Sequence, residues 1–146
     1  MRLLILMRGV PGSGKSTLAK KLAEDYRLCG YTCEIHSTDN YFMVDGEYRF
    51  NLDLLGTNHV KNQQAVKDAM SRGVEVIIVD NTNLSAKERK KYIDAAVTFN
   101  YTTEVHDSTT PWAKNAVECA KRNTHGVPLE TIQRMLQKLE SDTNVL

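Results

Sequence analysis

The sequence has almost no net charge. Its 19 lysine and arginine residues are nearly balanced by 18 aspartate and glutamate residues, which leaves a formal charge of +1 at pH 7. No global positive field therefore marks the chain as a nucleic-acid binder, and any such contact must come from a local patch. Charged residues make up 25% and hydrophobic residues 41% of the chain, which is typical of a folded globular protein and excludes a disordered one.

The sequence also lacks a long apolar run, internal repeats and low-complexity tracts. Arg8 interrupts the apolar N-terminus, which is too short to cross a membrane and has no signal-peptide cleavage region. The three cysteines are odd in number, and the spacing of Cys29 and Cys33 is not typical of a metal site. These absences predict a single domain over residues 1–146, with reduced thiols in the cytoplasm.

Residues 9–16 read G-x-x-x-x-G-K-S, the P-loop signature of proteins that bind nucleoside triphosphates. An apolar run precedes the motif and a helical pattern follows it, which is the context the motif requires. The loop N–H groups and the helix N-terminus form an anion site, Lys15 is expected to reach the β- and γ-phosphates, and Ser16 to hold Mg²⁺. The residues expected to bind ATP are Gly9, Gly12, Ser13, Gly14, Lys15, Ser16, Thr17 and Arg122.

Strand-like and helix-like patterns alternate along the chain. We expect strands near 3–7, 32–37, 74–80 and 101–106, and helices over 15–29, 57–72 and 85–98, from Thr110 and from Pro128. Segment 41–56 has no regular period and contains an Asp45-Gly46 turn signal. The alternation predicts a three-layer α/β fold, with about four parallel strands and helices on both faces. Ligands of such folds bind at the carboxyl ends of the strands.

Two aspartates follow expected strands. Asp39 is a candidate general base, which would accept the proton of an attacking hydroxyl, and a turn or cap role is the alternative. Asp80 closes an apolar run as in a Walker B element, and would hold Mg²⁺ directly or through water. A turn role for Asp80, or a metal role for Asp39, is the alternative there.

Residues 121–128 lie between a helical pattern and a Gly-Val-Pro break, which is consistent with a lid. A lid arginine at Arg122 would place positive charge over the phosphates and act with Lys15 and Asp39 in catalysis. The alternative is a solvated helix end, where an arginine favours the helix dipole. His125 stands beside a glycine, and we interpret it as a turn residue.

A basic cluster follows the expected third strand, and an aromatic loop follows the second. The cluster consists of Lys87, Arg89, Lys90 and Lys91. A solvated helix face is the ordinary interpretation of such a run, but a phosphodiester above the strand ends would meet it. Tyr41 or Phe42 could then stack on a base. Arg89 and Tyr41 are therefore candidate substrate contacts.

Four motifs in this order carry a resemblance to a known family. They are the P-loop, STDNYF at 37–42, VDNTNL at 79–84 and KRNTHGVP at 121–128. The chain resembles the kinase domain of polynucleotide 5′-hydroxyl kinases, which include the phage-type enzyme, the kinase half of eukaryotic repair proteins and AAA-labelled animal proteins. The resemblance covers nearly the whole chain. It implies that Lys15 and Ser16 serve ATP and Mg²⁺, that Asp39 is the base, that Asn81 and Asn83 lie on the acceptor side, and that Arg122 is the lid arginine.

The chain departs from this family at two acceptor-side positions. Phe42 stands where the phage-type enzyme has an arginine, and Asn81 stands where its D-T-N-L segment has a carboxylate, unless Asp80 substitutes. The chain is also too short to include the phosphatase domain of many such enzymes, so we expect no 3′-phosphatase activity.

Three functions fit these patterns. The first is ATP-dependent phosphorylation of the 5′-hydroxyl of DNA or RNA, which the basic cluster and the aromatic loop favour. The second is a kinase for a small molecule such as a sugar, a nucleoside or an antibiotic, which the low net charge and the missing arginine favour. The third is a non-catalytic ATP-binding module, which has no need of an acceptor base such as Asp39.

Overall fold

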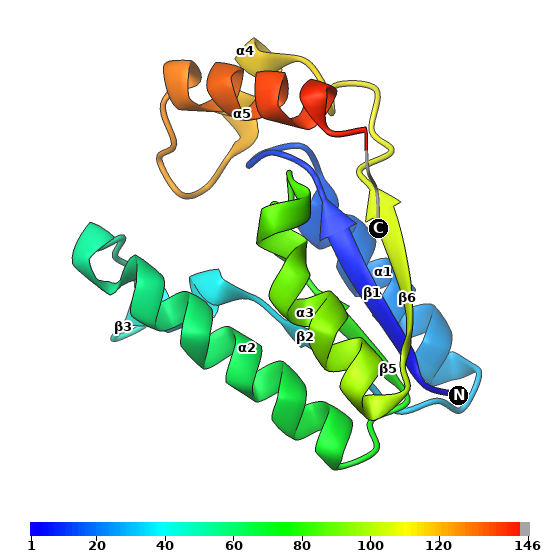
Figure 1. The fold of residues 1–146 in the computed structure, drawn as a ribbon. Helices are drawn as coiled ribbons and strands as arrows, with labels where there is room; N and C mark the ends of the chain where they lie inside the picture. The colour runs from blue at the N-terminus through cyan, green and yellow to red at the C-terminus, as the bar shows by residue number, and fades with distance from the viewer. Residues whose placement is uncertain (144–146) are drawn as a thin grey trace.

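The computed structural model describes residues 1–143, and its centre is a parallel sheet. The strands are β1 (Leu3–Arg8), β2 (Cys33–His36), β5 (Val76–Val79) and β6 (Thr102–Asp107), in the order β2-β5-β1-β6 (Figure 1). β1 and β5 are central, and all their side chains are buried and, apart from Arg8, apolar, as is typical of strands covered on both faces. The predicted α/β fold with a four-stranded parallel sheet is confirmed.

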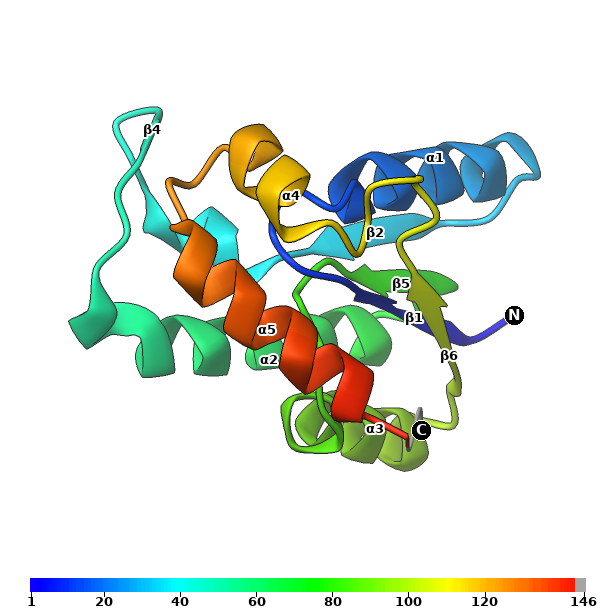
Figure 2. The same cartoon turned by 90° about the horizontal axis from the view of Figure 1, so that it is seen from above.

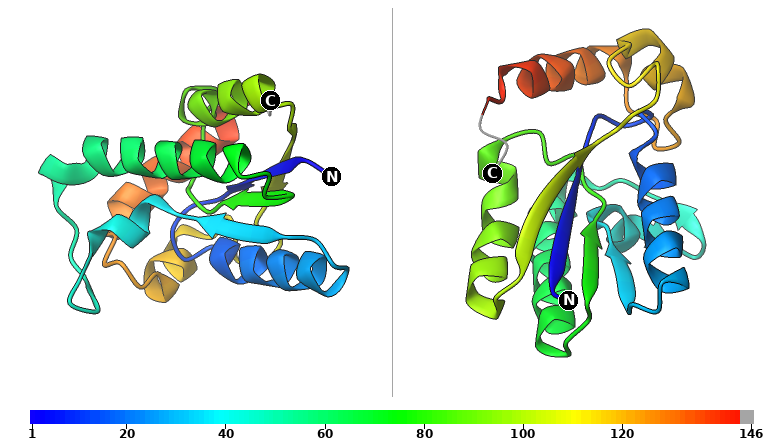
Figure 3. Two further views of the ribbon diagram at one scale, coloured as in Figure 1. Left: turned by 90° about the horizontal axis from the view of Figure 1, so that it is seen from below. Right: turned by 90° about the vertical axis from the view of Figure 1, so that its right-hand side faces the viewer.

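Helices cover both faces of the sheet, as the left panel of Figure 3 shows. The helices are α1 (Lys15–Leu28), α2 (Leu55–Ser71), α3 (Ala86–Phe99), α4 (Ala116–Arg122) and α5 (Leu129–Ser141). Side chains of β1 alternate between the faces: Ile5 packs with α1, whereas Leu4 and Leu6 pack with α2 and α3. None of the helices within 1–143 is both long and apolar enough to cross a membrane.

α4 and α5 lie above the carboxyl ends of the strands, and α5 crosses over them (Figures 1 and 2). The predicted apolar stripe of α5 packs inward, with Ile132 and Leu136 buried against Val10 and Leu84. Val10 belongs to the P-loop and Leu84 follows β5. α5, which directly follows the region 121–128 expected to form a lid, therefore rests on the loops that carry the candidate site.

A buried charge cluster anchors the end of α5. The Asp142 carboxylate accepts hydrogen bonds from Arg8 at 2.7 Å and from Arg89 at 2.8 and 3.1 Å. The side chains of Asp142, Arg8 and Arg89 are 6%, 9% and 0% exposed. Hydrogen bonds from Arg89 are the main cause that holds the pKa of Asp142 below its usual value. Interior ion pairs of this kind depend on each partner, because an unpaired buried charge is costly.

Two local predictions differ from the structure. Segment 41–56 contains a hairpin of β3 (Met43–Val44) and β4 (Glu47–Tyr48), whose turn residues Asp45 and Gly46 both have positive φ. The helix expected to begin at Thr110 begins at Ala116 instead, capped by Asn115. The Thr110 hydroxyl donates to the Ser13 carbonyl at 2.7 Å, so this side chain fixes the P-loop and does not cap a helix.

The edge strand β2 carries an ion pair that predicts acid sensitivity. Arg72 donates two hydrogen bonds to Glu34, at 2.8 and 2.9 Å, and these are the main cause that lowers the pKa of Glu34 to about 2. A carboxyl whose pKa is depressed by folding stabilises the fold above its ordinary pKa, and this contribution is lost as the pH falls. The native protein should unfold at a higher urea concentration than Glu34→Gln at neutral pH. We expect this difference in urea midpoint to shrink as the pH falls from about 4.5 to 2. Glu47→Gln, which removes an exposed ion pair on the hairpin, is the control. A difference in urea midpoint between the native protein and Glu34→Gln that stays constant over this pH range would contradict the prediction.

Candidate active site

The P-loop packs tightly against α4 and the segment that precedes this helix. Gly12 and Gly14 have positive φ, and Gly14 precedes the first residue of α1. Trp112 Nε1 donates to the Gly12 carbonyl at 3.1 Å. A β-carbon at Gly12 would lie 2.1 Å from the Cys119 carbonyl oxygen of α4. The motif needs glycine here because of its backbone conformation and because α4 approaches so closely.

This close approach gives a prediction for Gly12→Ala. The substitution combines left-handed backbone strain with a clash against the backbone of α4, and we expect it to lower the free energy of unfolding by about 2–5 kcal/mol. Gly46→Ala is the matched control, because Gly46 also has a positive φ but no atom lies within 4 Å of its added β-carbon. It should cost only about 1–2 kcal/mol. Equal losses in urea unfolding would show that α4 does not restrict Gly12.

Ser16 and Asp80 meet at the end of β5. The Ser16 hydroxyl donates to Asp80 Oδ2 at 2.7 Å, and Asp80 is 9% exposed. The other oxygen, Oδ1, is buried and has no hydrogen-bond partner among residues 1–143. A buried, unsatisfied carboxylate oxygen beside a hydroxyl fits Mg²⁺, which takes few protein ligands and completes its shell with water and phosphate. The described residues contain no group of three or more His, Cys, Asp or Glu side chains placed to hold a metal.

Asp39 lies in η1 (Thr38–Phe42), the short 3-10 helix that follows β2. The Asn81 amide oxygen, at the end of β5, accepts the Thr38 N–H at 2.9 Å and so fixes the start of η1. The Asp39 side chain is 42% exposed, which leaves it accessible to an incoming hydroxyl. Its neighbours are Tyr48, whose hydroxyl donates to Oδ1 at 3.3 Å, and His125, whose Nδ1 lies 3.3 Å from Oδ2.

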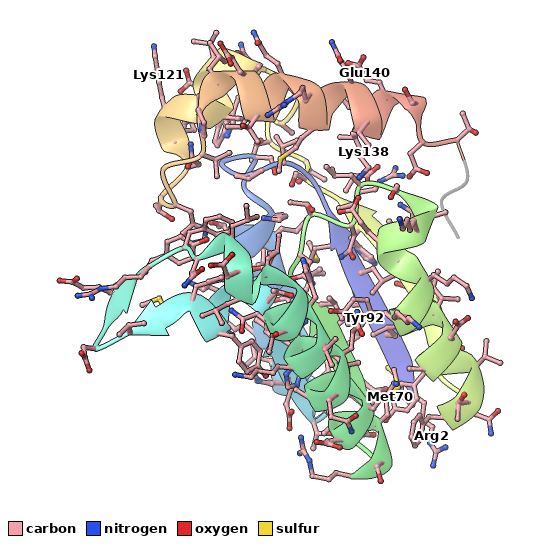
Figure 4. All side chains as sticks on the ribbon, turned by 60° about the vertical axis from the view of Figure 1, so that its left-hand side comes forward. Arg2, Met70, Tyr92, Lys121, Lys138 and Glu140 are labelled. Atoms are coloured by element: carbon pink, nitrogen blue, oxygen red, sulfur yellow. The ribbon has the colours of Figure 1, made fainter. Side chains whose placement is uncertain are left out.

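A buried polar network supports Asn81 from below. Tyr92 of α3, labelled in Figure 4, accepts hydrogen bonds from the Asn81 and Asn62 amides at 3.2 and 2.9 Å. Burial is the main cause that raises the pKa of the Tyr92 hydroxyl, which therefore stays neutral. Asn81 is thus held by α3 and holds η1 in turn. Its observed contacts fix the segment that carries Asp39.

Two residues expected to contact substrate lie in the interior. Asn83 is 2% exposed, and its amide donates to the Met7 carbonyl at 2.7 Å. Arg89 is fully buried and donates to the Asn83 carbonyl as well as to Asp142. Neither side chain is placed to touch a substrate, which corrects the expectations for Asn83 and Arg89. The other three members of the predicted basic cluster, Lys87, Lys90 and Lys91, are exposed on α3.

Arg122 ends α4, close to the P-loop contacts of that helix. Its guanidinium lies 3.6 Å above the centre of the Trp112 ring, and its Nε donates to Glu118 at 2.8 Å. The side chain is 47% exposed. Lys121 points away from the sheet (Figure 4), whereas Tyr41, 37% exposed, lies two residues after Asp39 in η1.

Sequence reasoning missed the two neighbours of Asp39. His125 was expected to be a turn residue, and Tyr48 had no assigned role. Their rings stack with centroids 3.9 Å apart and an angle of 16° between planes. A histidine three residues after the lid arginine was the only available signal, because the pairing joins segments 77 residues apart in sequence.

Comparison with known proteins agrees with this architecture. Residues 4–141 match the family model described as "AAA domain". The chain is 41% identical over 142 residues to human NEDD4-binding protein 2, covering 97% of this chain and 8% of that protein. It is 26% identical to rat 2',3'-cyclic-nucleotide 3'-phosphodiesterase, covering 95% of this chain and 31% of the relative. The chain therefore spans only a small part of the length of these relatives.

Solved structures share the fold at low sequence identity. The Pnkp1/Rnl/Hen1 RNA repair complex contains a chain with a TM-score of 0.72 and 18% identity, over 95% of this chain and 44% of that one. The APS kinase CysC of Mycobacterium tuberculosis has a TM-score of 0.54 and 15% identity, over 96% and 98% of the two chains. Since the family model covers nearly all of the chain, the protein belongs to this AAA domain family, with a P-loop kinase-like fold.

Proposed function

We propose that the protein is an ATP-dependent kinase that transfers the γ-phosphate to the 5′-hydroxyl of DNA or RNA. The observation that carries the proposal is that one continuous segment, 112–125, which ends within the expected lid, contacts both the P-loop and Asp39. Segment 112–125 contacts the P-loop through Trp112 and α4, and contacts Asp39 through His125. A nucleotide-binding loop and an exposed carboxylate under one lid are what transfer to an alcohol requires.

Each residue has a distinct role in this reaction. The P-loop N–H groups and Lys15 bind the β- and γ-phosphates, and Arg122 turns from Trp112 to balance charge on the transferred group. Ser16 and Asp80 would hold Mg²⁺, which supplies charge neutralisation when bound. The acceptor oxygen bonds to the γ-phosphorus as the bond to the bridging oxygen of ADP breaks. Asp39 takes the hydroxyl proton, which balances the step.

The nucleic-acid acceptor is supported by chemistry around Asp39. Tyr48 and His125 place aromatic rings beside the candidate base, and Tyr41 adds an exposed ring two residues along η1. Such rings suit the stacking of a terminal nucleobase. The RNA repair complex among the structural neighbours is consistent with this choice.

A small-molecule acceptor is the second candidate, and burial of Arg89 favours it. Only three lysines of the predicted basic cluster remain for phosphodiester contacts, and the hairpin beside the site carries more acidic than basic residues. Counterion release by lysine and arginine supplies much of the affinity for nucleic acids. Binding of a sugar or a nucleoside would not depend on this contribution to the affinity.

Label transfer from γ-labelled ATP distinguishes these candidates. The protein is incubated with Mg²⁺ and 5′-hydroxyl oligonucleotides of DNA and RNA, beside sugars, nucleosides and aminoglycosides, with Lys15→Ala as the inactive control. Label on an oligonucleotide that Lys15→Ala abolishes supports the proposal. Label confined to a small alcohol would replace it with the second candidate. ATP binding without transfer to any acceptor would indicate a non-catalytic module.

A further inference from the structure

The side chains around Asp39 form a continuous aromatic support. Phe42 is 2% exposed and contacts the Tyr48 ring edge-on, with centroids 6.0 Å apart. Tyr48 in turn stacks on His125. The position at which the phage-type enzymes have an arginine is thus occupied here by a ring that fixes Tyr48. Through Tyr48, the hairpin β3–β4 supplies the ring on which His125 stacks.

The lid loop is itself shaped to present His125. The Asn123 side chain donates to the carbonyls of Ala120 and Val127, at 2.8 and 3.1 Å, and accepts the Val127 N–H at 2.8 Å. Gly126 has a positive φ of 68° directly after the histidine. One side chain therefore closes loop 123–127 and directs His125 toward the hairpin. Arg122, the last residue of α4, directly precedes this loop, so the two lid residues are joined by a short, hydrogen-bonded segment.

Tyr48 and His125 together engage both oxygens of the Asp39 carboxylate. Tyr48 donates to Oδ1, and His125 Nδ1 lies beside Oδ2. Burial and the nearby Asp39 charge raise the pKa of Tyr48 to about 12, so this hydroxyl keeps its proton and remains a donor. Two neighbours on opposite oxygens restrict rotation of the carboxyl group and leave the remaining lone pairs to an acceptor hydroxyl.

We propose that Tyr48 and His125 are positioning residues that hold Asp39 as a base and make its competence depend on lid closure. The inference rests on the proposed kinase function and deepens it. The lid position in which His125 contacts Asp39 also holds Arg122 beside the P-loop, from which its side chain turns over the phosphates, so the donor and acceptor sides become ordered together. With the lid open, Asp39 keeps only Tyr48 and samples more orientations. A base oriented by a third group is a general feature of activated hydroxyl chemistry.

Double-mutant kinetics test this role. Tyr48→Phe keeps the stacked ring and removes the donor, and His125→Ala removes the lid contact. Each should lower kcat by about tenfold, the effect of one hydrogen bond to a charged group, and leave the KM for ATP within about twofold. In an Asp39→Asn background the same changes should cost less than about twofold, because residues that act through one group are not additive. Additive losses would indicate a merely structural role and overturn the inference.

Matched controls come from elsewhere in the chain. Tyr31→Phe lies at the opposite end of the sheet, and His106→Ala lies on β6, where His106 pairs only with Glu104 among the contacts described within 1–143. Both should keep kcat within about twofold, as surface changes away from a site do. Losses equal to those of Tyr48→Phe and His125→Ala would also overturn the inference.

Hydrogen exchange separates this inference from the proposed function. Asp39→Ala should increase amide exchange in loop 123–127, because the carboxylate no longer holds His125. If the native protein phosphorylates no acceptor but this exchange responds, the kinase proposal fails while the contact stands as a lid latch without catalysis. If the native protein is active and exchange is unchanged, the kinase proposal stands and the dependence on lid closure is overturned.

Discussion

Asp39→Asn is expected to lower kcat for phosphoryl transfer by about 10²–10⁴-fold, the usual contribution of a general base. The amide keeps the shape of the side chain but is a poor proton acceptor, so ATP affinity should change little. Single-turnover transfer from labelled ATP, with ATP affinity measured separately, checks both expectations.

Asp53→Asn is the matched control for this prediction. Asp53 lies in η2 (Leu52–Leu54), the short 3-10 helix just before α2, and the substitution makes the same change of charge near the same loop. Its kcat should stay within about twofold of the native value, as expected for an exposed side chain. Equal losses at Asp39 and Asp53 would show that general electrostatics, and not proton abstraction, explains the effect.

Asp142→Ala should lower the free energy of unfolding by about 3–5 kcal/mol, because it leaves two buried arginines without their shared carboxylate. Arg8 keeps Asp107 as a partner, whereas Arg89 is fully buried and keeps the Asn83 carbonyl among its contacts. The loss should also loosen α5 on the P-loop, because Asp142 follows that helix directly. Urea unfolding monitored by circular dichroism measures the change.

Asp94→Ala provides a comparison on the same helix as Arg89. Asp94 pairs with Lys90 at 2.8 Å, but both side chains are more than half exposed. Exposed pairs of this kind contribute at most about 1 kcal/mol, since solvent screens them. A loss at Asp142 no larger than that at Asp94 would mean that the buried cluster does not anchor α5.

The fold could be predicted from the sequence because its signals are local. The β-branched run at 76–79, the P-loop and the Ser85–Glu88 capping box each specify an element from adjacent residues, and the capping contacts are present. The prediction of a helix from Thr110 was wrong because a long-range contact overrides the local signal there. Its threonine and proline satisfy the local rule, but Thr110 binds a carbonyl 97 residues away.

Long-range pairing also explains which site residues could not be placed. Arg89 has the sequence context of a surface residue, and only the fold brings Asp142 to it from 53 residues away. Ser16 and Asp80 were predictable individually, and their contact follows from parallel strands that end at one edge. Tyr48 and His125 become neighbours of Asp39 only because the fold stacks their rings on one another. Local motifs therefore predict the P-loop and its elements, whereas the surroundings of Asp39 could be described only from the structure.

The most direct test of the account is transfer of label from γ-labelled ATP to a 5′-hydroxyl oligonucleotide, beside the same oligonucleotide with a phosphate already at its 5′ end. We predict label only on the 5′-hydroxyl strand, located at its 5′ end and removable by a phosphatase. Absence of label on the 5′-hydroxyl strand, or equal label on the blocked strand, would contradict the proposal that Asp39 and the P-loop phosphorylate a nucleic-acid 5′ end.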